Sequence, residues 1–125
     1  AVTQPGARSD EVVSLQSVYA TLADLAGLGV PVHVDGTSLR PLLEDPSSGW
    51  DEVAFTTAEF GSYAVQDDHF RYIRYLEGGE ELYDHHSDPN EWKNLASDPA
   101  FAETLEAMRA KVPPFDQQAP PQVLE

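Results

Sequence analysis

The period of the hydrophobic pattern changes from helical to extended at Trp50, and this change restricts the fold more than any other feature. Four short runs rich in β-branched and aromatic residues follow it, with only a few residues between them: 53–58, 62–66, 69–76 and 81–84. Alternating side chains are typical of strands. Strands so closely spaced are joined by tight turns, which requires antiparallel neighbours. The sequence therefore predicts a four-stranded antiparallel meander, with Gly78 and Gly79 in the last hairpin.

Helical patterns flank these runs. Val18, Leu22 and Leu25 share one face of a predicted helix that Ser17 would cap and Gly27 would end. Residues 11–15 resemble the end of a strand, and a short helix is expected over 38–44. Near the C-terminus Asp98 caps a further helix, with Pro99 at its first position. Its predicted buried stripe consists of Phe101, Leu105, Met108 and Val112.

These elements predict an α+β fold, in which the C-terminal helix packs on one face of the four-stranded antiparallel sheet. We divide the chain into an extended lead-in, a region of helix and loops, a sheet-and-helix region and a Pro-rich tail: 1–10, 11–49, 50–112 and 113–125.

The third strand carries apolar residues on both faces. Phe70 and Tyr72 point to one face, whereas Ile73 and Tyr75 point to the other. A sheet that one helix covers needs only one apolar face. We therefore expect the second face to dock on something absent from this chain, although such residues on a solvated face are also common.

Charge and composition exclude several classes of function. Seven Lys and Arg oppose 22 Asp and Glu, so the net charge of −15 would repel a nucleic acid. The absence of cysteine excludes a disulfide framework, a thiolate metal site and a cysteine nucleophile. No apolar run approaches the ~20 residues that span a bilayer, so we expect no membrane partner.

Asp84 to Glu91 contains the residue types of a metal site, and His85, His86 and Asp88 are the candidate ligands. Adjacent histidines on a strand point to opposite faces, however, and an Asp-Pro-Asn sequence is typical of a turn. Asp67, Asp68 and His69 could form an acid–base group or, equally, a turn between strands. Arg71 could bind an anion or form a cross-strand salt bridge.

The order of the motifs resembles the C-terminal portion of type I sulfatases, particularly the bacterial group similar to iduronate-2-sulfatases. The resemblance covers about residues 5–112 and is most specific in two blocks, DGTSLRPLL at 35–43 and FRYIRY…ELYDHHSDPNEWKNLA at 70–96. It implies that 11–49 holds the last helix of a large domain with an alkaline-phosphatase-like fold. Residues 50–112 would then be the C-terminal subdomain.

The same resemblance implies a parent protein that hydrolyses sulfate esters with a formylglycine nucleophile and Ca²⁺, in the periplasm or outside the cell. Neither the nucleophile nor the metal ligands can be assigned to this chain, so its N-terminal catalytic domain would be the partner. Loops at such a junction often line pockets. Tyr63, His69 and Arg71 are therefore our candidates for the wall of the substrate cleft, although Gln66 replaces an arginine common in that family.

Two other functions remain open from the residues alone. The chain could be a free-standing binding module with the same fold and no catalytic partner, or a metal-binding protein that uses residues 84–91. Self-association through the uncovered face of the sheet is a further possibility.

Overall fold

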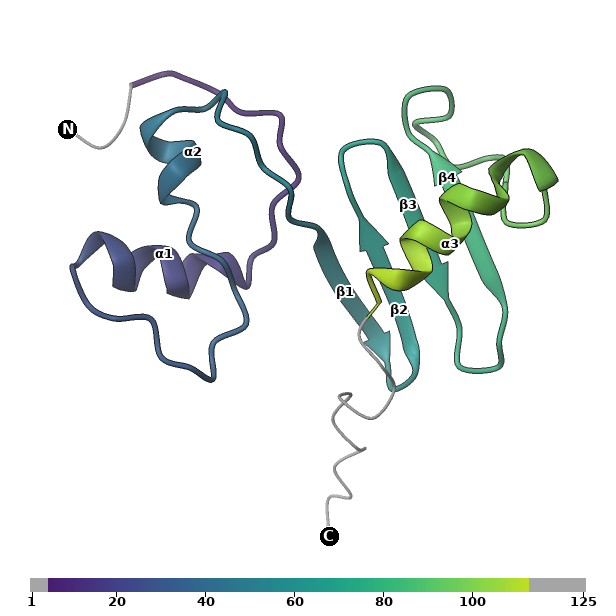
Figure 1. Ribbon diagram of the computed structural model, residues 1–125, viewed down its shortest axis with the longest axis horizontal. Coiled ribbons are helices and arrows are strands. Elements are labelled where there is room, and N and C mark those ends of the chain that lie inside the picture. The colour runs from purple at the N-terminus through teal and green to yellow at the C-terminus, as the bar shows by residue number, and fades with distance from the viewer. Residues whose placement is uncertain (1–4, 113–125) are drawn as a thin grey trace, which may run out of the picture. The chain divides into compact units, whose positions relative to one another are not determined.

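The computed structural model describes residues 5–112, which form parts of two compact units (Figure 1). The first unit extends to Glu52 and the second begins at Val53. The Pro-rich tail and the first four residues of the lead-in lie outside the described residues. Between residues 5 and 112, every helix is too short to cross a membrane.

The second unit contains the predicted antiparallel meander. Its strands are β1 (Ala54–Glu59), β2 (Ser62–Gln66), β3 (Phe70–Arg74) and β4 (Glu80–Asp84), in the order β1-β2-β3-β4. The β3–β4 hairpin closes where Tyr75 donates its amide to the carbonyl oxygen of Gly79 at 2.9 Å, and Gly78 takes a φ of +91°. This left-handed conformation favours glycine, which explains the Gly-Gly pair.

One row of facing residues forms the core. Val65, Tyr72 and Leu82 lie opposite one another across β2, β3 and β4, and all three are fully buried. Helix α3 (Ala102–Ala110) crosses this face of the sheet and packs Leu105 and Met108 against the row (Figure 1).

The start of the C-terminal helix has the predicted cap. The Asp98 side chain accepts the Ala100 amide at 3.0 Å, with Pro99 at the first position of a short 3₁₀ helix, η1 (Pro99–Phe101). Helix α3 continues from it. Phe101 and Val112 pack at the margin of the core, so the predicted stripe is confirmed.

A polar network links the sheet to α3. The carboxylate of Glu80 binds the guanidinium of Arg109, and the Tyr72 hydroxyl donates to Glu80 Oε1 at 2.5 Å. The hydrogen bond from Arg109 holds the pKa of Glu80 below its ordinary value, although burial opposes this. Burial and the neighbouring carboxylate raise the pKa of Tyr72 to about 12.

Residues 84–93, from the last residue of β4 onward, form a loop that we call the 84–93 loop. The segment that follows this loop covers the outer edge of β4. Asn94 Oδ1 accepts the Leu82 amide at 3.0 Å, its Nδ2 donates to the Glu80 carbonyl oxygen at 3.1 Å, and the Leu95 amide bonds the Leu82 carbonyl oxygen at 2.8 Å. Paired backbone groups cannot template another strand.

The opposite face of the sheet is mixed in character. Ile73, Tyr75 and Tyr83 are half-buried there, and the two tyrosine hydroxyls donate to the Glu81 carboxylate at 3.2 and 2.8 Å. The apolar residues expected on this face are therefore present, but a carboxylate lies among them.

The first unit holds α1 (Ser17–Leu25) and α2 (Arg40–Glu44). Thr21 joins them, because its Oγ1 donates to the Ser17 carbonyl oxygen at 2.6 Å and accepts the Leu39 amide at 2.9 Å. Asp24 accepts the Ser38 hydroxyl at 2.7 Å and binds Arg40. These contacts tie α1 to the segment that begins α2.

Two local predictions in this unit are wrong. The helix begins at Ser17 itself, after Gln16, and has no side-chain cap; Ser17 is buried in its first turn. Residues 11–15 form no strand, because their backbone joins no sheet and Leu15 is 90% exposed.

Candidate functional site

A first cluster of titratable side chains lies where β3 begins and β4 ends. His69 Nε2 is 3.0 Å from Asp84 Oδ1, and the His69 ring stacks on that of His86, with centroids 4.0 Å apart. Burial opposes ionisation of Asp84, but hydrogen bonds from Ser87 and from the His86 amide hold its pKa below the ordinary value. The cluster therefore places the His69 ring beside an ionised carboxylate.

A second cluster is centred on Glu91. Its carboxylate accepts from Arg71 Nη1 at 3.0 Å and lies 2.8 Å from His85 Nε2. Burial opposes ionisation of Glu91, but these contacts hold its pKa below the ordinary value. Arg71 thus forms an ion pair, with a loop residue instead of a neighbouring strand.

The candidate metal ligands have separate partners. His85 contacts Glu91, whereas His86 stacks on His69, so the two rings point apart as predicted, although both lie in the turn that follows β4. Asp88 accepts the Lys93 amide at 2.8 Å, which closes a turn. Within residues 5–112 no three side chains of the types that bind metals are grouped so as to hold an ion, and the described residues do not fit a Ca²⁺ site.

Asp67 closes the turn between β2 and β3. Its Oδ1 accepts the amides of His69 and Phe70 at 3.0 and 2.7 Å, and its Oδ2 binds Lys111 at 2.6 Å. Burial opposes ionisation, but Lys111 and the amides hold the pKa of Asp67 below its ordinary value. The structure therefore favours the turn over the acid–base interpretation.

Tyr63 differs from the other two cleft candidates in burial. Only 5% of it is exposed, its ring stacks on Phe55 with centroids 5.4 Å apart, and its hydroxyl accepts the Gly61 amide at 3.1 Å. His69 and Arg71 keep 39% and 36% of their side chains exposed. These two can therefore reach a ligand without a change in the core.

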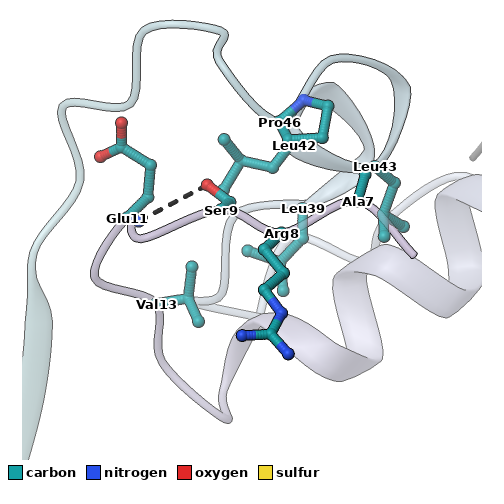
Figure 2. A pocket seen from close by; sticks show the side chains of 9 residues that line it. All are labelled: Ala7, Arg8, Ser9, Glu11, Val13, Leu39, Leu42, Leu43 and Pro46. Atoms are coloured by element: carbon teal, nitrogen blue, oxygen red, sulfur yellow. Dashed lines mark hydrogen bonds between the residues drawn. The ribbon is translucent and has the colours of Figure 1, made fainter. Parts of the chain in front are cut away.

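The first unit has a cavity of about 250 Å³ between the lead-in and α2 (Figure 2). Leu39, Leu42, Leu43, Val13 and Pro46 supply most of its apolar lining. Arg8 and Glu11 also line it, but their charged ends point away from each other (Figure 2). The cavity suits an apolar side chain and has no acid–base pair.

The apolar stripe predicted for α1 faces outward. Val18, Leu22 and Leu25 are 45%, 62% and 42% exposed, whereas Ser17 and Ala20 are buried on another side of the helix. Further large apolar side chains are exposed on α1 and just beyond its ends: Leu15, Tyr19 and Leu28. Exposed apolar runs of this kind are typical of interaction surfaces.

Two features around the 84–93 loop of the sheet unit were not found from the sequence. The contact of Glu91 with Arg71 joins residues 20 positions apart, so spacing gives no sign of it. Trp92 is 85% exposed on the 84–93 loop, and aromatic residues usually signal a core position, so its exposure was not expected.

Comparison with known proteins places these observations in a family. The family model for the C-terminal region of N-sulphoglucosamine sulphohydrolase matches residues 1–118. A sulfatase of Formosa agariphila is 38% identical over 108 residues, which are 86% of this chain and 21% of that protein. A delta 4,5-hexuronate-2-O-sulfatase of Bacteroides thetaiotaomicron is 41% identical over 101 residues, 72% of this chain and 21% of that protein.

A solved 2-O GAG sulfatase has the same fold over the shared region. It superposes with a TM-score of 0.61 at 36% identity and covers 75% of this chain and 22% of that one. The chain thus spans about a fifth of the length of the relatives that it matches.

Proposed function

Because the chain belongs to the family of C-terminal sulfatase domains, we propose that it covers the catalytic domain of a sulfate-ester hydrolase without catalysing the reaction itself. The observation that carries the proposal is the outward apolar stripe of α1. The relatives are about five times longer than the matched region, so most of each relative lies outside it. A catalytic domain of that kind would bury the stripe.

The reaction chemistry is assigned to residues outside this chain. In such a hydrolase a formylglycine would supply the nucleophile, and Ca²⁺ would supply positive charge against the sulfate. The chain has no cysteine and no serine in a Ser-x-Pro-x-Arg motif to give a formylglycine, and the described residues do not fit Ca²⁺. We therefore propose no catalytic step on this chain.

Within the proposal, His69 and Arg71 are the residues that face the substrate cleft. Both have half-exposed side chains, and each is oriented by a carboxylate, Asp84 or Glu91. A positioned cationic group can bind the sulfate or carboxylate of a sulfated sugar. Tyr63 supports the β1–β2 hairpin from within.

Turnover of a chromogenic aryl sulfate tests the proposal. The full-length gene product should hydrolyse it, and the 125-residue chain alone should not. Turnover by the chain alone, or none by the full-length protein on aryl and saccharide sulfates, would contradict it. Replacing His69 with Ala should raise KM for a saccharide sulfate more than it lowers kcat.

The role of the α1 stripe has a separate test. Leu22→Asp should lower the melting temperature of the full-length protein, because it places a charge on a face that the catalytic domain would bury there. In the isolated chain the same change should reduce dye binding, because it interrupts the exposed apolar stripe. Val32→Asp is the matched control, since Val32 is fully exposed outside the helix. A free-standing module would instead be a monomer that binds no hydrophobic dye, and Leu22→Asp would leave its melting unchanged.

A further inference from the structure

We propose that Trp92 is an anchor that inserts into an apolar pocket with a basic rim on the catalytic part of the parent protein. The proposal rests on the proposed function and adds a second point of attachment, which lies on the sheet unit and not on α1. Four observations support it: the exposure of the indole, the fixed backbone beneath it, the charge around it and the length of the relatives.

The indole is exposed without a structural reason within the chain. Trp92 is 85% exposed, and among residues 5–112 its N–H finds no acceptor. Trp50 provides the comparison, because it is half-buried and donates its indole N–H to the Val12 carbonyl oxygen at 3.0 Å. Tryptophan combines a large apolar surface with one donor, which makes it a frequent binding anchor.

The backbone beneath the indole is fixed on both sides. Glu91 has a φ of +57°, a left-handed conformation that an ordinary residue adopts at a cost, and Arg71 and His85 hold its carboxylate. On the other side the Lys93 amide bonds Asp88 Oδ2, and Asn94 is bonded to β4. A side chain presented from a fixed backbone loses little entropy on binding.

The surrounding charge favours a partner surface that carries Lys or Arg. The 84–93 loop carries Asp84, Asp88 and Glu91 against a single cation, Lys93, and its two histidines contact Glu91 and the ring of His69. Lys or Arg on the rim of a protein pocket would be attracted to these carboxylates.

The length of the relatives is our reason for placing the pocket on the catalytic part of the parent protein. About four fifths of each matched relative lies outside the matched region. A covalently linked domain is present at high effective concentration, so even one aromatic anchor would be occupied.

Replacing Trp92 in two contexts tests the proposal. In the isolated chain Trp92→Ala should leave the melting temperature unchanged, because the indole is almost fully exposed there. In the full-length protein the same change should lower the apparent melting temperature by ~2–4 °C or more, and Trp92→Phe should recover most of that loss. Leu76→Ala is the matched control for an exposed apolar residue of the sheet unit.

The other outcomes are distinct. Equal melting of wild type and Trp92→Ala in the full-length protein would overturn the anchor, and so would destabilisation of the isolated chain. An unchanged melting temperature with KM raised for a saccharide sulfate would overturn it too and assign Trp92 to the substrate. Absence of sulfatase activity in the full-length protein would refute the proposed function while leaving the melting comparison valid.

Discussion

Gly36 lies where two stretches of backbone pass too closely for any side chain. A Cβ at this position would be 2.2 Å from the Gln16 carbonyl oxygen and 2.9 Å from the Ser17 Cα. Both are backbone atoms, so no rotamer change relieves the clash. The loop before α2 therefore reaches the start of α1 only because residue 36 is a glycine.

We predict that Gly36→Ala destabilises the first unit by about 1–3 kcal/mol, the usual cost of overpacking. Hydrogen exchange of the α1 amides, which should become faster, measures the effect. Gly49→Ala is the control, since a Cβ there would have nothing within 4 Å. Equal exchange rates in the two variants would contradict the close approach.

Tyr72 gives a prediction in the alkaline range. Its pKa of about 12 lies above the ordinary value of 10, so the folded state holds the phenolic proton more tightly than the unfolded state does. The resulting stability is complete below pH 10 and is lost as the pH rises toward 12. Absorbance of phenolate should show Tyr72 and Tyr83 ionising near pH 12. Tyr72→Phe should remove one of these two steps; titration of all five tyrosines near pH 10 would disprove the prediction.

At the scale of elements, the Asn94 side chain makes hydrogen bonds to β4 that a fifth strand would otherwise make. Its side chain makes hydrogen bonds with the Leu82 amide, the Ala96 amide and the Glu80 carbonyl oxygen. Asn94→Ala would leave the amide of a buried residue without an acceptor, which costs about 1–3 kcal/mol. We expect urea unfolding to show a loss of that size, whereas Asn90→Ala, in the exposed loop, should change stability little. A neutral Asn94→Ala variant would mean that water replaces the amide.

The sequence predicted elements well where a residue's partners lie within the chain. Val65, Tyr72 and Leu82 alternate with more polar or less buried residues, and each faces the next across the sheet, so the meander and its helix followed from periodicity. The stripe of Val18, Leu22 and Leu25 is equally regular, yet it faces outward, because periodicity identifies an apolar face and not what covers it.

The candidate site was harder to predict for a different reason. The prediction that His85 and His86 point apart is confirmed, although both lie in the turn just after β4 and not on the strand from which the prediction was argued. The Glu91 contacts with Arg71 and His85 depend on how the 84–93 loop folds back, which local sequence does not determine. Trp92 was missed because aromatic residues are usually buried.

At the scale of the whole molecule, the hydrophobic core belongs to one unit. All residues of the core cluster and all those packed against it lie between Val53 and Val112, whereas α1 presents much of its apolar surface to solvent. The two units should therefore differ greatly in independent stability.

We predict that residues 53–125 fold alone, with a cooperative thermal transition and the β-type circular dichroism of the whole chain. Residues 1–52 alone should show little helix, since isolated short helices are marginal in water. Loss of the transition in a polypeptide of residues 53–125 would show that the first unit is needed to fold the sheet.

Because the Asn94 contacts occupy the edge of β4, they also determine which edge of the sheet can accept a further strand. With β4 sealed by its own chain, a further strand can be added only beside β1, whose outer edge has no strand partner in residues 5–112. A strand from a neighbouring domain, or from another copy of the chain in an aggregate, can therefore extend this sheet only at the edge formed by Ala54–Glu59.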